Sequence, residues 1–268
     1  MRKAKLLAAC LSVAILGGQT LPMQGPLPLA DPRKEKTEEE TAQPKESVQG
    51  KDKQPPESDD DKSKADAESV ATPPSEDLEV EPESTEDHAR CLAELEALSV
   101  TFTPAERLDE GKGCGIDKPL LVTVIQPGVT LKPEGKLRCP AALALARWTK
   151  ETVLPAAGIA FAGDTVVSLD QASAYVCRLR NNAETGKISE HARGNAVDIA
   201  SFTFKSGKTV EIKPRREDST FSGAFQRSVT AAACLYFTTV LDPESDAAHE
   251  NHLHLDVLQR KGGYRYCR

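Results

Sequence analysis

The pattern of apolar and polar positions predicts regular structure only from about residue 89 onward. Helical spacing of apolar residues marks three segments, at 91–98, 140–154 and 220–241. Runs that are β-branched or alternate in polarity predict strands at 100–102, 120–125, 173–178, 196–204, 209–212, 252–258 and 264–267, and turn residues predict a loop at 111–119. Because strands and helices are interspersed, the pattern is typical of an α+β fold with a small antiparallel sheet packed against helices.

Trp148, the only tryptophan, falls on the apolar face of the predicted helix at 140–154. An aromatic residue in a helical apolar stripe is more often part of a core than a platform for a substrate. We therefore expect Trp148 to be buried.

The first thirty residues have the pattern of an export signal. A start with three basic residues is followed by an apolar run at 6–16, which is shorter than the roughly 20 residues that span a bilayer. No later segment is long and apolar enough to span a membrane. Almost no apolar residues precede Cys10, so we expect no lipid attachment there.

Residues 31–88 hold 20 acidic and 8 basic side chains, and they contain no aromatic residue and no cysteine. Such a composition cannot bury enough apolar surface to offset the entropy of ordering, so we predict a disordered acidic tether. We expect this tether to act as a spacer, with contact to another envelope protein as the alternative role. The remaining segment, 89–268, has a net charge of only +2, which gives no electrostatic reason to expect a nucleic acid partner.

Six cysteines follow Cys10, at positions 91, 114, 139, 177, 234 and 267. An even number of cysteines behind an export signal predicts three disulfides and an oxidising compartment, here the periplasm. No two of them form a Cys-x-x-Cys pair, which argues against a sulfur metal site. We expect Cys91 to pair with Cys114 because this pairing closes a short loop, and the other four remain open.

Four of the five histidines lie in two short segments. The first, Ser-Glu-His-Ala-Arg-Gly-Asn-Ala-Val-Asp at 189–198, contains His191 and Asp198 around a glycine that permits a sharp turn. The second, His-Glu-Asn-His-Leu-His-Leu-Asp at 249–256, contains His252 and His254, which share one face if the segment is a strand. Three ligands and an open position are typical of catalytic zinc, so we predict that His191, Asp198 and His254 hold this metal.

Residues near these ligands can supply the rest of a hydrolytic site. His252 is our first candidate for the general base, and His249 or Glu250 can assist it. Arg178 or Arg180 can bind a substrate carboxylate or stabilise a developing oxyanion. We expect Ser189 either to contact the substrate or to fix the tautomer of His191. We expect Asp256 to orient a metal ligand rather than to bind the metal itself.

Residues 89–268 resemble the bacterial extensin-like C-terminal domain family. The resemblance lies in Cys177-Arg178, Asn181-Asn182, the 189–200 segment Ser-Glu-His-Ala-x-Gly-Asn-Ala-x-Asp-Ile-Ala, and His-x-x-His-x-His-x-Asp at 249–256. The H-x6-D and H-x-H elements are also similar to those of the LAS peptidases and hedgehog, and their spacing is closest to that of penicillin-insensitive murein endopeptidase.

The resemblance to LAS enzymes implies a LAS/hedgehog-like fold with the same three zinc ligands. It also implies that His252 is the catalytic histidine, that His249 is an additional active-site histidine, and that the substrate is the peptide of bacterial peptidoglycan. Two alternatives stay open at this point. The first alternative is that the chain is a non-catalytic zinc-containing module that binds cell wall or a partner. The second is that it is a wall protein without metal. The bond that an enzyme of this kind would cut, by endopeptidase or carboxypeptidase action, also stays open.

Overall fold

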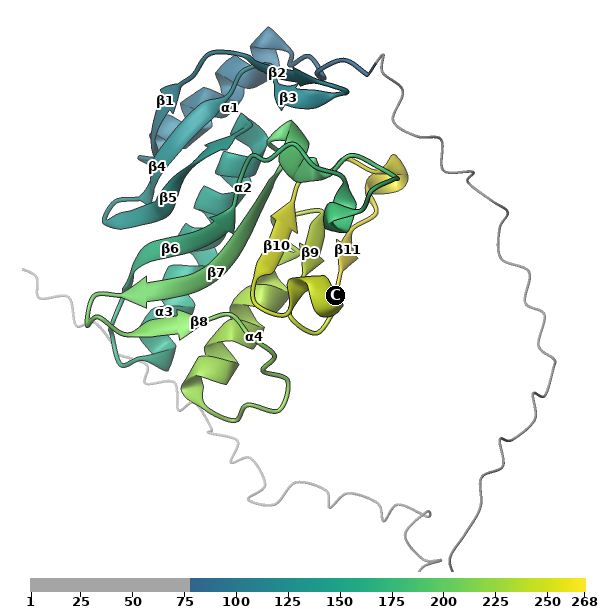
Figure 1. Cartoon of the computed structure of the whole chain (residues 1–268). Coiled ribbons are helices and arrows are strands. Elements are labelled where there is room, and N and C mark those ends of the chain that lie inside the picture. Colours follow the sequence, from purple (N-terminus) through teal and green to yellow (C-terminus); the bar gives the residue numbers. More distant parts are fainter. Residues whose placement is uncertain (1–77) are drawn as a thin grey trace, which may run out of the picture. The chain divides into compact units, whose positions relative to one another are not determined.

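The computed structural model describes residues 78–268 (Figure 1). The predicted export signal and most of the predicted tether lie outside the described residues. Among the helices of the described part, none is long and apolar enough to cross a membrane.

A mixed sheet forms the centre of the described part, and its strands follow the order β1-β4-β5-β6-β7-β10-β9-β11 (Figure 1). Most neighbours are antiparallel, while the β5–β6 and β9–β11 pairs are parallel. The strands of this path are β1 Thr101–Pro104, β4 Leu120–Gln126, β5 Val129–Leu137, β6 Val166–Ser173, β7 Ala196–Phe204, β9 Thr239–Leu241, β10 Leu253–Asp256 and β11 Tyr266–Cys267. The short strand β8 (Thr209–Glu211) pairs with β7, and β2 (Leu108–Gly111) and β3 (Cys114–Ile116) form a separate hairpin. The predicted α+β class is confirmed.

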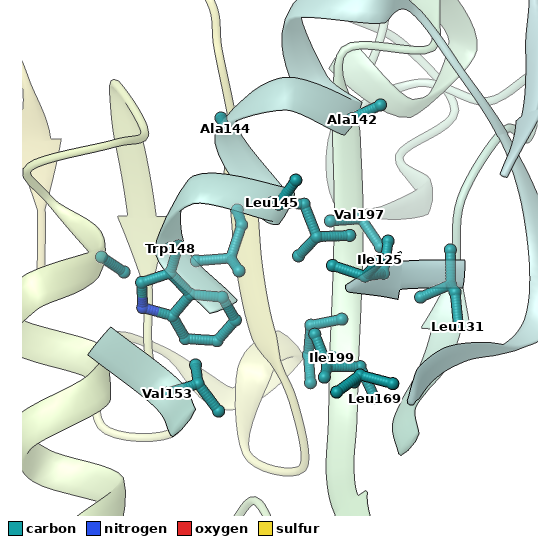
Figure 2. Packing of buried hydrophobic residues seen from close by; sticks show 14 of the residues in the cluster. Ile125, Leu131, Ala142, Ala144, Leu145, Trp148, Val153, Leu169, Val197 and Ile199 are labelled. Atoms are coloured by element: carbon teal, nitrogen blue, oxygen red, sulfur yellow. The ribbon is translucent and has the colours of Figure 1, made fainter. Parts of the chain in front are cut away.

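Helices pack on the sheet and enclose the main core (Figure 1). They are α1 Thr85–Ala97, α2 Cys139–Trp148, a π-helical turn at Thr149–Val153, α3 Leu154–Ala160 and α4 Phe221–Ala233. Trp148 is fully buried, and its indole Nε1 donates a hydrogen bond of 2.9 Å to the carbonyl of Val229. Figure 2 shows it among the aliphatic side chains of α2 and the sheet. The prediction that Trp148 belongs to the core is confirmed.

The pairing of β7 with β10 determines which residues face away from this core. Val197 and Ile199 of β7 pair with Leu255 and Leu253 of β10, and all four side chains are fully buried in the core. Because successive side chains of a strand point to opposite faces, the residues between them point to the other side of the sheet. The polar pair on that side is Asp198 and His254, and both belong to the site described below.

The fold also includes residues that the sequence pattern assigns to the tether. Helix α1 begins at Thr85, four residues before the predicted start of the domain, and Ser84 caps it. The side chain of Val80 is buried, and the Glu83 carboxylate lies 3.1 Å from the Nε of Arg138. The last part of residues 31–88 is therefore packed against the domain.

Several predicted elements are displaced. The strand expected at 173–178 is wrong, because the chain leaves the sheet at Ser173, where β6 ends. The predicted long helix at 220–241 stops at Ala233, with β9 beginning at Thr239. The Thr-Thr-Val-Leu run at 238–241 favours a strand, although its apolar residues continue the helical period. Strand β5 was not predicted, because its Lys-Pro-Glu-Gly centre has the composition of a turn.

Three disulfides are present, as predicted, and they indicate an oxidising environment outside the cytosol. Their pairing is Cys91–Cys139, Cys114–Cys177 and Cys234–Cys267, so the expected Cys91–Cys114 bond is wrong. Cys91 lies on the side of α1 that packs against α2, and α2 begins with Cys139, so the two Cα atoms are 6.1 Å apart. Loop length alone does not reveal this contact between helices.

Replacing Trp148 with Phe is expected to lower the free energy of unfolding by about 2 kcal/mol. The change removes the hydrogen bond to Val229 and leaves a small cavity in a close-packed core. Urea unfolding followed by circular dichroism measures this difference. The control is Phe221→Leu, because Phe221 is 71% exposed and its replacement should leave the midpoint unchanged. Equal midpoints for the Trp148 variant and the unaltered protein would contradict the core assignment.

Candidate metal centre

Three side chains from separate elements meet on the face of the sheet that points away from the main core. Asp198 of β7 and His254 of β10 occupy directly paired positions, and His191 comes from the 3-10 turn η3 (Glu190–Arg193). The Nε2 of His191 lies 3.0 Å from Oδ1 of Asp198 and 3.1 Å from Nδ1 of His254, and Nδ1 of His254 lies 2.9 Å from the same Oδ1. All three side chains are buried, and their ligand atoms are close enough together to share one metal ion.

The outer hydrogen bonds of the two imidazoles determine which nitrogen faces inward as a lone pair. Nδ1 of His191 donates to the carbonyl of Ala174 at 2.6 Å, and Nε2 of His254 donates to Oδ2 of Asp256 at 3.2 Å. Carbonyl and carboxylate oxygens only accept, so in the neutral form of each imidazole the opposite ring nitrogen carries the lone pair. Two nitrogen lone pairs and a carboxylate therefore converge, which is the donor set that a divalent cation requires.

The spacing and the electrostatics of this cluster both fit a cation. Ligand atoms around tetrahedral zinc are separated by about 3.3 Å when the metal–ligand bonds are about 2.0–2.1 Å long. Burial raises the pKa of Asp198, but hydrogen bonds with His191 and His254 outweigh it and hold this pKa well below its usual range. Burial lowers the pKa of His254, but its bonds to Asp198 and Asp256 outweigh this and raise the pKa to about 9. These pKa shifts describe the cluster without a metal, where protons on the inward nitrogens hydrogen-bond to Asp198. A divalent cation would replace those protons and use the same lone pairs.

The local sequence explains how His191 is brought to the sheet. The hydroxyl of Ser189 caps η3 by accepting from the backbone N–H of His191 at 3.4 Å, and Gly194 ends the turn with a φ of +70°. A side chain at Gly194 would also place its Cβ only 2.4 Å from Cδ1 of Ile116. The turn expected at Gly194 is confirmed. The tautomer of His191 is fixed by Ala174, whereas Ser189 holds its backbone.

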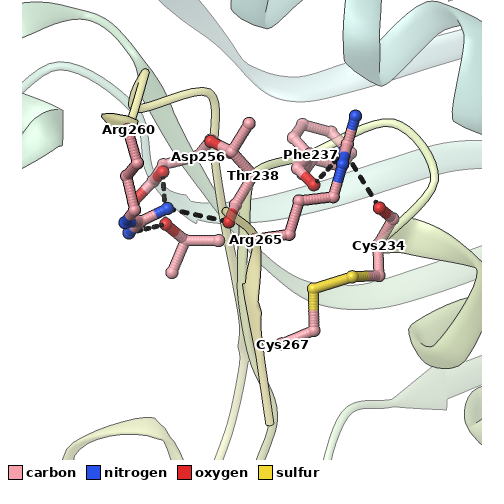
Figure 3. The surroundings of a disulfide bond; sticks show 8 residues. Cys234, Phe237, Thr238, Asp256, Arg260, Arg265 and Cys267 are labelled. Atoms are coloured by element: carbon pink, nitrogen blue, oxygen red, sulfur yellow. Dashed lines mark hydrogen bonds between the residues drawn. A yellow bond between two sulfur atoms is a disulfide. The ribbon is translucent and has the colours of Figure 1, made fainter. Parts of the chain in front are cut away.

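A chain of hydrogen bonds holds Asp256, the carboxylate that accepts from His254, and Figure 3 shows Asp256 together with Arg260. Oδ1 of Asp256 accepts from the hydroxyl of Thr239 at 2.6 Å, and that hydroxyl accepts from Nη2 of Arg260 at 2.7 Å. Nη1 of Arg260 donates to the carbonyl of Thr238 at 2.8 Å. Because a guanidinium only donates and a carboxylate only accepts, the direction of the whole chain is fixed.

The disulfide Cys234–Cys267 lies beside this network and joins the end of α4 to β11 (Figure 3). Nη1 of Arg265 donates to the carbonyls of Cys234 and Phe237, at 2.9 and 2.7 Å. Strand β11 pairs with β9 at Thr239, so these links fix the strand that carries the hydroxyl next to Asp256.

Two more histidines lie next to the triad. Nε2 of His252 is 3.8 Å from Oδ1 of Asp198, and its Nδ1 donates to Oδ1 of Asn251 at 2.8 Å. Burial lowers the pKa of His252 below its ordinary value. His249 is buried, its ring centroid is 5.2 Å from that of His252, and its Nδ1 lies 2.7 Å from Oδ1 of Asp246.

Comparison with known proteins supports the same segments. A family model described as extensin-like protein C-terminus matches residues 89–268, which is most of the chain and contains every residue of the triad. The chain belongs to the extensin-like family. No curated protein and no solved structure matches it.

Two cavities flank the triad of this extensin-like domain, and the predicted arginines line them. The smaller cavity, of about 140 Å³, is lined by Arg178, Arg180 and Arg260, together with Ser189, His191 and His254. The larger, of about 310 Å³, is lined by Ser173, Val176, Arg178, Asn181, Asn182, Ala248, His249 and His252. Arg178, Asn181 and His249 line both cavities, so the two cavities are adjacent at these residues, next to the triad.

The two predicted arginines differ in how closely they approach the triad. Nη2 of Arg178 lies 3.6 Å from Oδ2 of Asp198, and its side chain is 23% exposed. Nη2 of Arg180 lies 3.6 Å from Oε1 of the buried Glu190, and its side chain is 47% exposed. Glu250, which was predicted to assist catalysis, is exposed and lines neither cavity.

Sequence reasoning missed three groups that shape the extensin-like site. The carbonyl of Ala174 is a backbone atom and leaves no signal in residue types. Thr239 and Arg260 lie on either side of the His-x-His motif in the chain, and neither belongs to a recognisable pattern. Only the strand pairing β9–β10 could have indicated Thr239, because it places this residue opposite Asp256.

Replacing Asp256 with Asn is expected to weaken zinc binding by about 10- to 100-fold, since the amide can present an N–H to Nε2 of His254 and no longer fixes its tautomer. Competition with a chromophoric chelator measures the affinity of the oxidised protein. Asp109→Asn, at an exposed position on β2, serves as the matched control and should leave the affinity unchanged. Unchanged affinity in the Asp256 variant would show that the orientation of His254 does not depend on this carboxylate.

Proposed function

We propose that this extensin-like protein is an exported zinc-dependent hydrolase that cleaves peptide bonds of bacterial peptidoglycan. The observation that carries the proposal is the convergence of three buried acceptor atoms, on His191, Asp198 and His254, beside the half-buried His252. A purely structural metal site in a protein is normally closed by four protein ligands, whereas three protein ligands leave a position for water or substrate.

The residues that would hold the metal are two imidazoles and one carboxylate. This mixed nitrogen and oxygen set suits zinc better than magnesium or calcium, which prefer oxygen ligands alone. When bound, zinc supplies Lewis acidity and lowers the pKa of a water molecule in the open position. The remaining chemistry belongs to side chains of this chain.

His252 is the group best placed to take a proton from the attacking water. Its Nδ1 donates to Asn251, so the lone pair lies on Nε2, the nitrogen that is 3.8 Å from Oδ1 of Asp198. A neutral imidazole is the form that can act as a base, and the lowered pKa of His252 favours that form. His249 lines both cavities and packs beside His252, where it limits the positions that the His252 ring can adopt.

Arg178 is the cation nearest to the place where charge would develop. Its guanidinium is 3.6 Å from Oδ2 of Asp198 and lines both cavities, so it borders the path of a substrate on either side. A partly buried guanidinium can stabilise an oxyanion or hold a carboxylate by two parallel hydrogen bonds. We assign Arg178 the role of binding the carbonyl oxygen of the peptide bond that is cut.

The two cavities favour an internal bond over a terminal one. A carboxypeptidase needs room for only one residue beyond the reacting carbonyl, whereas an endopeptidase must bind chain on both sides. The smaller cavity collects three arginines, which suits the free carboxylates that peptidoglycan peptides carry. The larger cavity holds Ser173, Val176 and Ala248, which suits small neutral residues. Peptide cross-links in the wall combine free carboxylates with small neutral residues.

Incubation of the protein with purified sacculi is expected to release cross-linked peptides as uncross-linked products. We expect His252→Ala to slow product formation at least 100-fold, because general base catalysis contributes about 10²–10⁴-fold. A chelator should abolish release, and added zinc should restore it. The matched control is His88→Ala, which removes the one histidine outside the two motif segments. Mass spectrometry of the released muropeptides measures both the rate and the bond.

Two outcomes of this experiment would overturn parts of the proposal. Equal rates for the His252→Ala variant and the unaltered protein would remove His252 as the base. Retention of zinc together with binding of sacculi and no new product would instead support the non-catalytic module as the function. Loss of only a terminal residue from stem peptides would identify a carboxypeptidase and contradict the assignment of an internal bond.

A further inference from the structure

A separate cavity of about 300 Å³ lies on the other face of the sheet from the triad. Val240 of β9 lines it, whereas the neighbouring residues Thr239 and Leu241 line the cavity next to His254. Alternate residues of a strand point to opposite faces, so β9 separates the two cavities. The other walls come from the segment after β8, from α4 and from β11.

Basic residues from three separate segments line this cavity, namely the segment after β8, helix α4 and the residue after β11. They are Lys213, Arg215, Arg216, Arg227 and Arg268, and the only acidic residues that line it are Asp242 and Glu244. The domain as a whole has a net charge of only +2. The concentration of cations therefore reflects the fold at this point and not the general composition.

Only part of this positive charge is neutralised within the described residues. Arg215 pairs with Asp218, and Nε of Arg216 lies 2.9 Å from Oε2 of Glu244. Across residues 78–268, no carboxylate forms an ion pair with Lys213, Arg227 or Arg268. The guanidinium of Arg268 lies over the ring of Tyr266, which lines the cavity next to His254. An anion in the present cavity would therefore meet two cations that are not already paired, Lys213 and Arg227, and such cations gain most from a charged hydrogen-bond acceptor.

The cations are held in place by neutral groups. Nη1 of Arg227 donates to the carbonyls of Arg215 and Asp218, both at 2.6 Å, which leaves its Nε and Nη2 available. The side-chain amide of Gln226 on α4 bonds the backbone N–H and the carbonyl of Lys213 and accepts from Nε of Arg215. The basic segment is therefore fastened to α4 without a ligand, and a preorganised site loses less entropy on binding.

We propose that this cavity binds the phosphate group of a small ligand, as a free phosphate ester or as a lipid headgroup. Cations that surround a cavity from several directions match a tetrahedral anion with several acceptor oxygens, whereas a planar carboxylate is satisfied by one guanidinium. Ala231, Val240 and Cys267 supply an apolar part of the wall for the carbon atoms of the ester. The volume is at the lower end for ligand sites, which suits a glycerol-sized group.

The site is independent of the proposed hydrolase. It shares no lining residue with the two cavities at the triad, and it uses neither zinc nor the histidines. Absence of peptidoglycan cleavage would leave the phosphate site unaffected, and absence of phosphate binding would leave the hydrolase unaffected.

Isothermal titration of the oxidised full chain with glycerol phosphate, at constant ionic strength, tests the proposal. We expect saturable binding to one site, with acetate binding at least tenfold more weakly. Lys213→Gln and Arg227→Gln should each weaken glycerol phosphate binding about tenfold, because each removes one charged hydrogen-bond donor from the cavity. Lys150→Gln, at an exposed position on the π-helical turn, is the matched control and should bind as the unaltered protein does.

A second arm distinguishes the two sources of phosphate. Binding to vesicles of phosphatidylglycerol but not phosphatidylcholine, reduced by free glycerol phosphate, would support a headgroup, and glycerol phosphate binding without vesicle binding would support a soluble ester. The melting temperature without ligand shows that each variant is folded. No saturable binding at millimolar glycerol phosphate, equal affinity for acetate, or unchanged affinity in folded Lys213 and Arg227 variants would overturn the proposal.

Discussion

The antiparallel pairing of β7 with β10 is the constraint on which the site depends. It places Asp198 directly opposite His254, while their neighbours Val197, Ile199, Leu253 and Leu255 are buried against the helices. A shift of one residue in this register would turn the carboxylate and the imidazole into the core and the aliphatic residues toward the triad. Apolar burial therefore selects the register, and the register brings the ligand atoms together.

Each imidazole of the triad is then oriented by an acceptor that cannot donate. The carbonyl of Ala174 lies just beyond the end of β6, and the carboxylate of Asp256 lies two residues beyond His254 on the same strand face. Disulfides close both regions, since Cys114–Cys177 ends next to Arg178 and Cys234–Cys267 ties β11 to α4. The result is a cluster whose geometry is set before any ligand arrives, and the proposed hydrolysis would require such preorganisation.

The triad and the approximate positions of the strands and helices could be predicted from the sequence. The contacts that join distant segments could not. The two histidine motifs were recognisable because the chain has only five histidines and four of them lie in these two segments. The strand 196–204 was predicted with its observed limits, since apolar and β-branched residues run through it, although their alternation changes phase at the irregularity between Ile199 and Ser201. The Cys91–Cys139 pairing, the end of α4 and the network through Thr239 and Arg260 depend on how helices and strands pack, which local patterns do not encode.

The central claim is that His191, Asp198 and His254 hold one divalent ion, and elemental analysis combined with X-ray absorption at the metal edge tests it most directly. The oxidised protein, purified and dialysed after exposure to zinc, should retain about one zinc per chain, with two imidazole nitrogens at about 2.0–2.1 Å and oxygen ligands completing the shell. The Asp198→Ala variant should retain far less. A folded protein that keeps well under one zinc per chain, or an Asp198→Ala variant that binds zinc with an unaltered spectrum, would contradict the account.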